Sequence, residues 1–126
     1  MSDVSQLPAN VQERIARLQQ LQNTMQQLQA QRQQIEMETA ETERAIKTLE
    51  ETAESAKVYK SAGAVLVEKE KASVVKELKE RQDFLEMRGK VIEKQEEKTK
   101  EKLQGLQETL QKELNAPKSS RQSTSG

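Results

Sequence analysis

Apolar residues recur in alternating steps of three and four along most of the chain. We call the positions that this spacing selects the seam, because they form the stripe that would face a partner helix. The first half has fourteen seam positions, of which ten are apolar. These positions are Val11, Arg14, Leu18, Leu21, Met25, Leu28, Arg32, Ile35, Thr39, Thr42, Ile46, Leu49, Ala53 and Ala56. A three-four rhythm sustained over about six heptads is typical of a coiled coil rather than of a surface helix. Asn10, followed three residues later by Glu13, matches a capping box and predicts the helix start.

The same rhythm returns in the second half, where seven of twelve seam positions are apolar. These positions are Val75, Leu78, Gln82, Leu85, Gly89, Ile92, Glu96, Thr99, Leu103, Leu106, Leu110 and Glu113. Ser73 is a suitable N-cap, and Pro117 disfavours helix at the residue before it, so this helix is predicted to end near Asn115. Two helices of matched length about a central connection predict an antiparallel coiled-coil hairpin. We therefore expect an N-terminal extension over 1–9, the coiled-coil hairpin over 10–115 and a disordered polar tail over 116–126.

The central stretch KVYKSAGAVLVEK, residues 57–69, departs from this rhythm. β-branched and aromatic residues stand on both sides of a Ser-Ala-Gly turn, which predicts a short β-hairpin over about 57–68. The alternative is a plain apolar connector, although connectors between helices are usually short and polar. A lone two-stranded hairpin is marginally stable and has open edges. We therefore expect it to pair with hairpins of other subunits, through Val58, Tyr59, Val65, Leu66 and Val67.

Polar or small residues interrupt both seams near their middles. The interruptions are Arg32, Thr39 and Thr42 in the first seam and Gln82, Gly89 and Glu96 in the second. Reflection about the central turn places the two sets opposite one another. A rod that bends midway and harmless drift in a long coiled coil both explain this pattern.

Composition excludes several classes of function. The chain has 21 basic and 21 acidic residues, so it lacks the basic excess that binding to nucleic-acid phosphates requires. It has neither Cys nor His, which removes the thiolate nucleophile and the commonest metal ligand and general base. With no phosphate loop or catalytic carboxylate pair visible, we predict no catalytic, cofactor-binding or metal site, and no enzyme. No apolar run could span a membrane and no signal peptide begins the chain, so we expect a cytoplasmic protein.

The ends of the predicted rod carry the candidate ligand-binding residues. These are Leu7, Val11, Ile15 and Leu18 at one helix end and Leu106, Leu110 and Leu114 at the other. Ile15 and Leu114 lie one position off the seam, so the facing helix cannot cover them fully. Apolar groups rimmed by Gln, Glu and Lys could hold unfolded chains without sequence preference. Alternatively, these residues simply complete the coiled coil.

Three stretches resemble the archaeal beta-type subunit of prefoldin. They are LPANVQERIARLQQLQ at 7–22, VYKSAGAVLV at 58–67 and KVIEKQEEKTKEKLQ at 90–104. The resemblance covers residues 7 to about 114, and the central stretch is its most specific part. It carries no function onto the tail after Pro117.

The resemblance implies a heterohexamer of two alpha-type and four beta-type subunits. Its β-hairpins would form an intersubunit β-barrel hub from which the coiled coils project. Such co-chaperones hold unfolded client proteins at the coiled-coil tips without ATP and deliver them to a group II chaperonin. The runner-up function is a passive coiled-coil scaffold or tether that oligomerises through the central β-hairpin.

Overall fold

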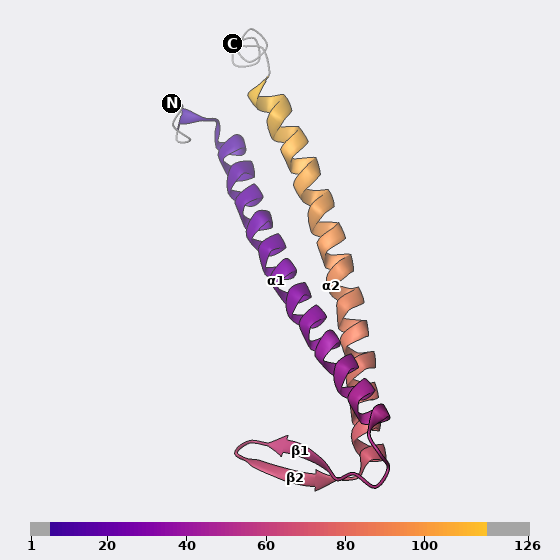
Figure 1. The fold of residues 1–126 in the computed structure, drawn as a ribbon. Helices are drawn as coiled ribbons and strands as arrows, with labels where there is room; N and C mark the ends of the chain where they lie inside the picture. The colour runs from indigo at the N-terminus through magenta and orange to yellow at the C-terminus, as the bar shows by residue number, and fades with distance from the viewer. Residues whose placement is uncertain (1–5, 116–126) are drawn as a thin grey trace, which may run out of the picture. The chain divides into compact units, whose positions relative to one another are not determined.

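The computed structural model describes residues 6–115 and consists of two long helices with a β-hairpin between them (Figure 1). The element order is α1 (Ala9–Glu51), β1 (Val58–Ala62), β2 (Val65–Lys69) and α2 (Lys71–Leu114). The helices contain 43 and 44 residues. This confirms the predicted mainly helical fold with a short central hairpin. The predicted tail over 116–126 lies outside the described residues.

Both helices begin earlier than the predicted caps. The backbone N–H groups of Val11 and Gln12 donate to the carbonyl of Pro8, each at 3.0 Å, and α1 begins at Ala9. Asn10 therefore already lies inside the helix. The predicted N-cap of the second helix, Ser73, is likewise wrong, because the Val74 N–H donates to the carbonyl of Glu70 at 3.1 Å. In both cases a main-chain carbonyl one turn earlier accepts the first helical bond, which side-chain patterns do not reveal.

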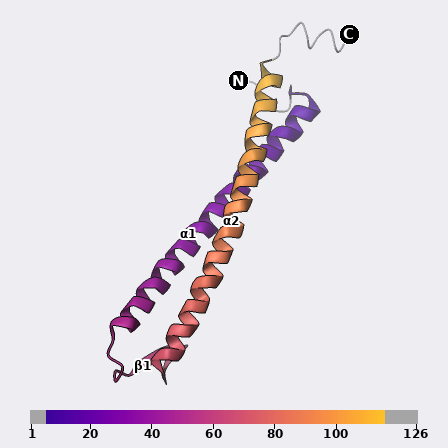
Figure 2. The ribbon, with the colours of Figure 1, turned by 90° about the vertical axis from the view of Figure 1, so that its right-hand side faces the viewer.

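The chain divides into two compact units, which we name by their contents. The hairpin unit is residues 30–93, and the tip unit is made, among the described residues, of 6–29 together with 94–115. Within each unit, a segment of α1 and a segment of α2 run in opposite directions (Figure 2).

Salt bridges define the antiparallel pairing in the hairpin unit. Arg81 Nη2 lies 3.1 Å from Glu38 Oε2, and Lys71 Nζ lies 3.2 Å from Glu54 Oε1. Later residues of α1 thus face earlier residues of α2. Between them lies an apolar core in which Leu85 is only 2% exposed. The other buried apolar residues contributed by the helices of this unit are Ile35, Ile46 and Ile92.

Two of the seam interruptions in the hairpin unit are accommodated inside this core. Thr42 is buried, and its hydroxyl donates to the Glu38 carbonyl one turn earlier at 2.8 Å. A Cβ added at Gly89 would lie 3.8 Å from Ile35 Cγ2, an ordinary van der Waals distance. The seam at these positions is therefore packed, although its residues are small or polar.

Candidate functional site

The hairpin is an antiparallel pair closed by a two-residue turn. Ala62 pairs with Val65, which leaves Gly63 and Ala64 as the turn residues. Gly63 has φ +62°, and it is the one residue with positive φ among those described. Glycine at the first turn position suits a type II′ turn, whose twist matches the flanking strands. The predicted Ser-Ala-Gly turn was wrong in this detail, because Ser61 and Ala62 belong to β1.

Apolar side chains lie on both faces of the hairpin. Directly opposed residues share a face, so the register assigns Val65 and Val67 to the face that also carries Val58 and Lys60. The other face carries Tyr59 and Leu66. A hairpin resting on a core with one face in water would show apolar residues on one face only. The run Val65–Leu66–Val67 instead suits a strand covered on both sides.

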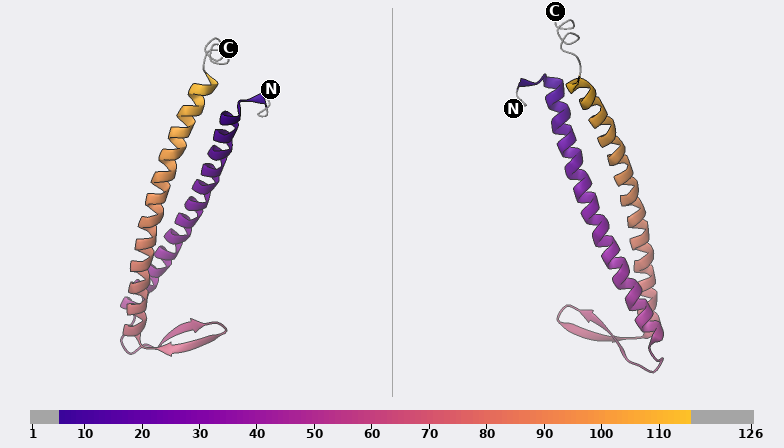
Figure 3. Two further views of the ribbon diagram at one scale, coloured as in Figure 1. Left: turned by 180° about the vertical axis from the view of Figure 1, so that it is seen from behind. Right: turned by 45° about the horizontal axis from the view of Figure 1, so that its top comes forward.

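Four of the five predicted hairpin contact residues are exposed on this chain. The exposed fractions are 52% for Tyr59, 60% for Val65, 71% for Leu66 and 40% for Val67. Val58 differs, because it is only 8% exposed. It lines a groove with the helix residues Ala45, Leu49, Val74 and Leu78. Val58 therefore anchors the hairpin to its own helices, and the rest of the hairpin projects sideways from them (Figure 3).

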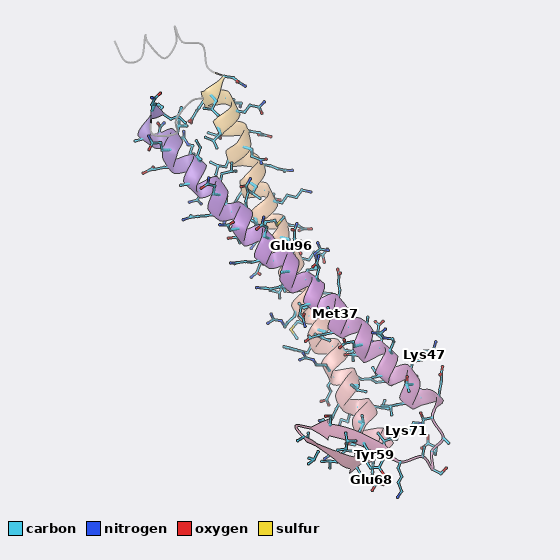
Figure 4. All side chains as sticks on the ribbon, turned by 60° about the vertical axis from the view of Figure 1, so that its left-hand side comes forward. Met37, Lys47, Tyr59, Glu68, Lys71 and Glu96 are labelled. Carbon is cyan, nitrogen blue, oxygen red and sulfur yellow. The ribbon has the colours of Figure 1, made fainter. Side chains whose placement is uncertain are left out.

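Two lysines bind the hairpin and its connections to the helices. Lys60 Nζ donates to Glu77 Oε2 at 2.8 Å, and this hydrogen bond, with the charge of Lys60, lowers the pKa of Glu77. Lys71 Nζ donates to the Thr52 carbonyl at 2.8 Å and to Glu54 at 3.2 Å. Figure 4 places Lys71 at the junction of the hairpin and α2. The hairpin is thus attached to the helices through the buried Val58 and through charged hydrogen bonds.

The seven predicted tip residues differ in exposure. Val11 and Leu110 are buried in the seam, each 5% exposed, whereas Leu114 is 48% exposed. The remaining four, Leu7, Ile15, Leu18 and Leu106, are half-buried. Ile15 and Leu114 are both incompletely covered, as their off-seam positions suggest.

An ion pair occupies the seam at the tip. Arg14 Nη1 contacts Glu113 Oε1, and the two side chains are 35% and 26% exposed. The sequence analysis placed both residues in the seam but did not predict the pair, although their opposite charges at matching ends of the two helices could have indicated it. The pair brings the predicted tip residues of the two helices together at one end of the tip unit.

Exposed apolar side chains also occur on the helices of the hairpin unit. They are Met37, Phe84, Met87 and Val91, with exposed fractions from 40% to 65%. The Arg81 guanidinium lies 5.3 Å from the centroid of the Phe84 ring. Figure 4 marks the position of Met37 on α1. Phe84 and Val91 lie off the three-four seam, which is why the seam pattern did not select them.

No metal-binding cluster occurs within residues 6–115, where no three Asp or Glu side chains gather closely enough. In the same part of the chain, neither helix is apolar enough over a sufficient length to cross a membrane.

Comparison with known proteins identifies the family of this chain. A family model described as prefoldin subunit matches residues 12–116. The chain belongs to the prefoldin subunit family. Prefoldin subunit beta of Methanothrix thermoacetophila is 42% identical over 109 residues, which cover 86% of this chain and 91% of that protein. Prefoldin subunit beta of Methanocella arvoryzae is 44% identical over 111 residues, 88% of each chain.

A solved structure has the same fold. The crystal structure of the prefoldin beta subunit from Thermococcus strain KS-1 superimposes with a TM-score of 0.80 at 33% sequence identity. The match covers 93% of this chain and all of that one. The two-helix fold with a central hairpin is therefore that of a prefoldin beta subunit.

Proposed function

We propose that this chain is the beta-type subunit of an ATP-independent co-chaperone that holds unfolded proteins at its coiled-coil tips. Assembly is supported by the hairpin, which exposes apolar side chains on both faces and has open strand edges. Client holding is supported by the partly covered apolar side chains at the tip, above all Leu114, which is 48% exposed. A family of chaperone subunits supplies the context. We expect a hairpin with this surface to pair with strands of other subunits, since a free hairpin would be marginally stable and prone to aggregation.

The proposed assembly contains two alpha-type and four beta-type subunits. Their hairpins form a β-barrel hub, in which Tyr59 and Leu66 pack on one side and Val65 and Val67 on the other. The exposure of all four residues on the single chain supports this arrangement. Val58 contributes by fixing the hairpin to the helices of its own subunit.

In the proposed activity, the tip residues hold unfolded client proteins in the cytoplasm and release them to a group II chaperonin. Leu114 is exposed, and Leu7, Ile15, Leu18 and Leu106 are half-buried. Partly covered apolar side chains surrounded by polar ones suit weak binding of many different unfolded sequences.

A passive scaffold or tether is the second candidate function. The burial of Val11 and Leu110 favours it, because a closed seam offers little apolar surface to a client. Both candidates use the hairpin for oligomerisation. They differ in whether the tips bind anything.

Aggregation suppression by the assembled complex tests the proposal. The chain is mixed with an alpha-type subunit, the mass of the assembly is measured, and a denatured client is diluted into it. A chain trimmed before Val11 and after Leu106 should assemble at the mass expected for its shorter length but suppress aggregation much less. A chain ending at Asn115 keeps all seven tip residues and serves as the control. Undiminished suppression by the trimmed complex would favour another contact surface, and no suppression by the intact complex would favour the scaffold.

A further inference from the structure

Arg14 and Glu113 occupy seam positions where a coiled coil ordinarily has apolar side chains. We propose that their ion pair acts as a latch: it holds the two helix ends together in the absence of a client and breaks easily when one binds. The tip of the coiled coil then opens, and Val11 and Leu110 contact the unfolded client. This inference rests on the proposed function, because it concerns how the tips gain access to clients.

The positions of the four residues make opening necessary for contact. Val11 precedes Arg14 by one seam step, and Leu110 precedes Glu113 by one seam step. Both apolar residues are only 5% exposed while the ion pair is formed. A client can therefore touch them only if the two helix ends separate.

The chemistry of the pair makes separation easy at this layer. Both side chains are partly exposed, so water and salt screen their attraction. Glu113 Oε2 is buried and has no hydrogen-bond partner among residues 6–115, which disfavours the closed state. On opening, both charged groups regain full hydration, whereas a pair of apolar side chains would be returned to water at a loss.

The location of the pair has the same effect. Arg14 lies in the second turn of α1, and Glu113 is the second-last residue of α2. Helix ends open locally at lower free energy than helix centres. A weak seam layer next to two helix ends thus keeps Val11 and Leu110 covered in the absence of a client and exposes them at little cost when one arrives.

The decisive variant carries Arg14→Leu together with Glu113→Leu, assembled with the alpha-type subunit. Apolar side chains in this layer should close the tip, so the melting temperature should rise while the apparent affinity for a denatured client falls about tenfold, in proportion to the open fraction. If opening is required, stability and client holding should move in opposite directions in this variant, while the glutamine variant described next keeps its client holding. A merely structural role for the pair would move them together.

Two further variants separate the effect of the charges from the effect of the added apolar side chains. Arg14→Gln with Glu113→Gln removes the charges without closing the tip, so client holding should not fall. Glu38→Leu with Arg81→Leu replaces an interhelical ion pair of the hairpin unit and controls for added apolar side chains. Equal losses in the leucine and glutamine tip variants would mean that the charges themselves contact the client, and the latch would be rejected. Unchanged or stronger holding by the leucine tip variant would also reject it, whereas failure of the wild-type complex to hold clients would reject the proposed function instead.

Discussion

Gly63 and Gly105 show how differently one residue type acts at two places in the chain. Gly63 sits in the hairpin turn with φ +62°, a region that side-chain-bearing residues rarely adopt. Gly105 lies inside α2, and a Cβ added there would meet nothing within 4 Å. The first glycine is required by the backbone, whereas the second only lowers helix propensity.

Substitution of these two glycines by alanine should therefore have opposite effects. Gly63→Ala should destabilise the hairpin by about 1–2 kcal/mol, because of the strain of a Cβ at positive φ. Gly105→Ala should stabilise α2 by roughly 0.5–1 kcal/mol. Thermal unfolding of both variants measures the difference. Equal effects of the two substitutions would contradict the assigned turn.

Glu77 is the residue through which pH should affect the hairpin. The hydrogen bond from Lys60 and its charge lower the pKa of Glu77 below its ordinary value of 4.5. A carboxyl group with a lowered pKa stabilises the folded state above its unfolded value, and that contribution is lost as pH falls through the folded pKa. The attachment of β1 to α2 should thus weaken below pH 4.5.

Nuclear magnetic resonance titration of the Glu77 carboxyl group measures this effect directly. The midpoint should lie below 4.5 in the wild-type protein and rise toward that value in a Lys60→Met variant. A Lys79→Met variant removes a lysine that pairs instead with Glu50 at 3.7 Å and should leave the midpoint in place. An unchanged midpoint after loss of Lys60 would show that the hydrogen bond does not persist in solution.

At the scale of the helices, the seam tolerates polar residues whose hydroxyl groups bond within their own helix. Thr42 and Thr99 are both buried. Their hydroxyls donate to the carbonyls of Glu38 and Gln95, each at 2.8 Å. Such threonines satisfy their polar atoms but bury less apolar surface than leucine, so the seam is weaker at these positions.

Hydrogen exchange should reveal whether this weak seam permits bending. Residues 32–42 and 82–96 should exchange faster than the flanking heptads if the coiled coil bends midway. The substitution Gly89→Ala should slow exchange there, since it raises helix propensity and its Cβ would meet Ile35 at an ordinary distance. Uniform protection along both helices would contradict the bend and leave the interruptions as neutral variation.

At the scale of the whole molecule, the exposed hairpin is the feature on which the proposed assembly depends. The exposed apolar residues of the hairpin lie on both of its faces, and the chain belongs to a family of subunits. The proposed hub would bury these residues, whereas the apolar core between the helices lies within the chain itself.

Val65→Asp together with Val67→Asp should abolish assembly while leaving helix content nearly unchanged. Burial of two unpaired carboxylates in the hub would be strongly unfavourable, but both side chains are exposed on the single chain. Assembly mass and circular dichroism measure the two properties. Met87→Asp with Val91→Asp places the same charges on exposed positions of α2 and should assemble normally. Assembly of the hairpin variant at wild-type mass would rule out the hub.

Local patterns in the sequence determined the element types and their order. The three-four rhythm predicted both helices, and the β-branched cluster around Gly63 predicted the hairpin. These patterns suffice because helix and strand periodicity depend on neighbouring residues alone. The predicted N-caps Asn10 and Ser73 lie two and three residues beyond Pro8 and Glu70, whose carbonyls accept the first helical hydrogen bonds.

Only the tertiary structure decided which apolar residues remain available. Val58 and Tyr59 are adjacent, and the sequence predicted both as contact residues of the hairpin. The helices nevertheless cover Val58 and leave Tyr59 exposed. Val11 and Leu114 were predicted to act together at the tip, yet one is buried beside the Arg14–Glu113 pair and the other is exposed. Exposure depends on what the facing helix brings to each side chain, and that contact joins residues about a hundred positions apart, such as Arg14 and Glu113. The sequence by itself could therefore name the surface residues, but the packing of α1 against α2 determined which of them a partner can reach.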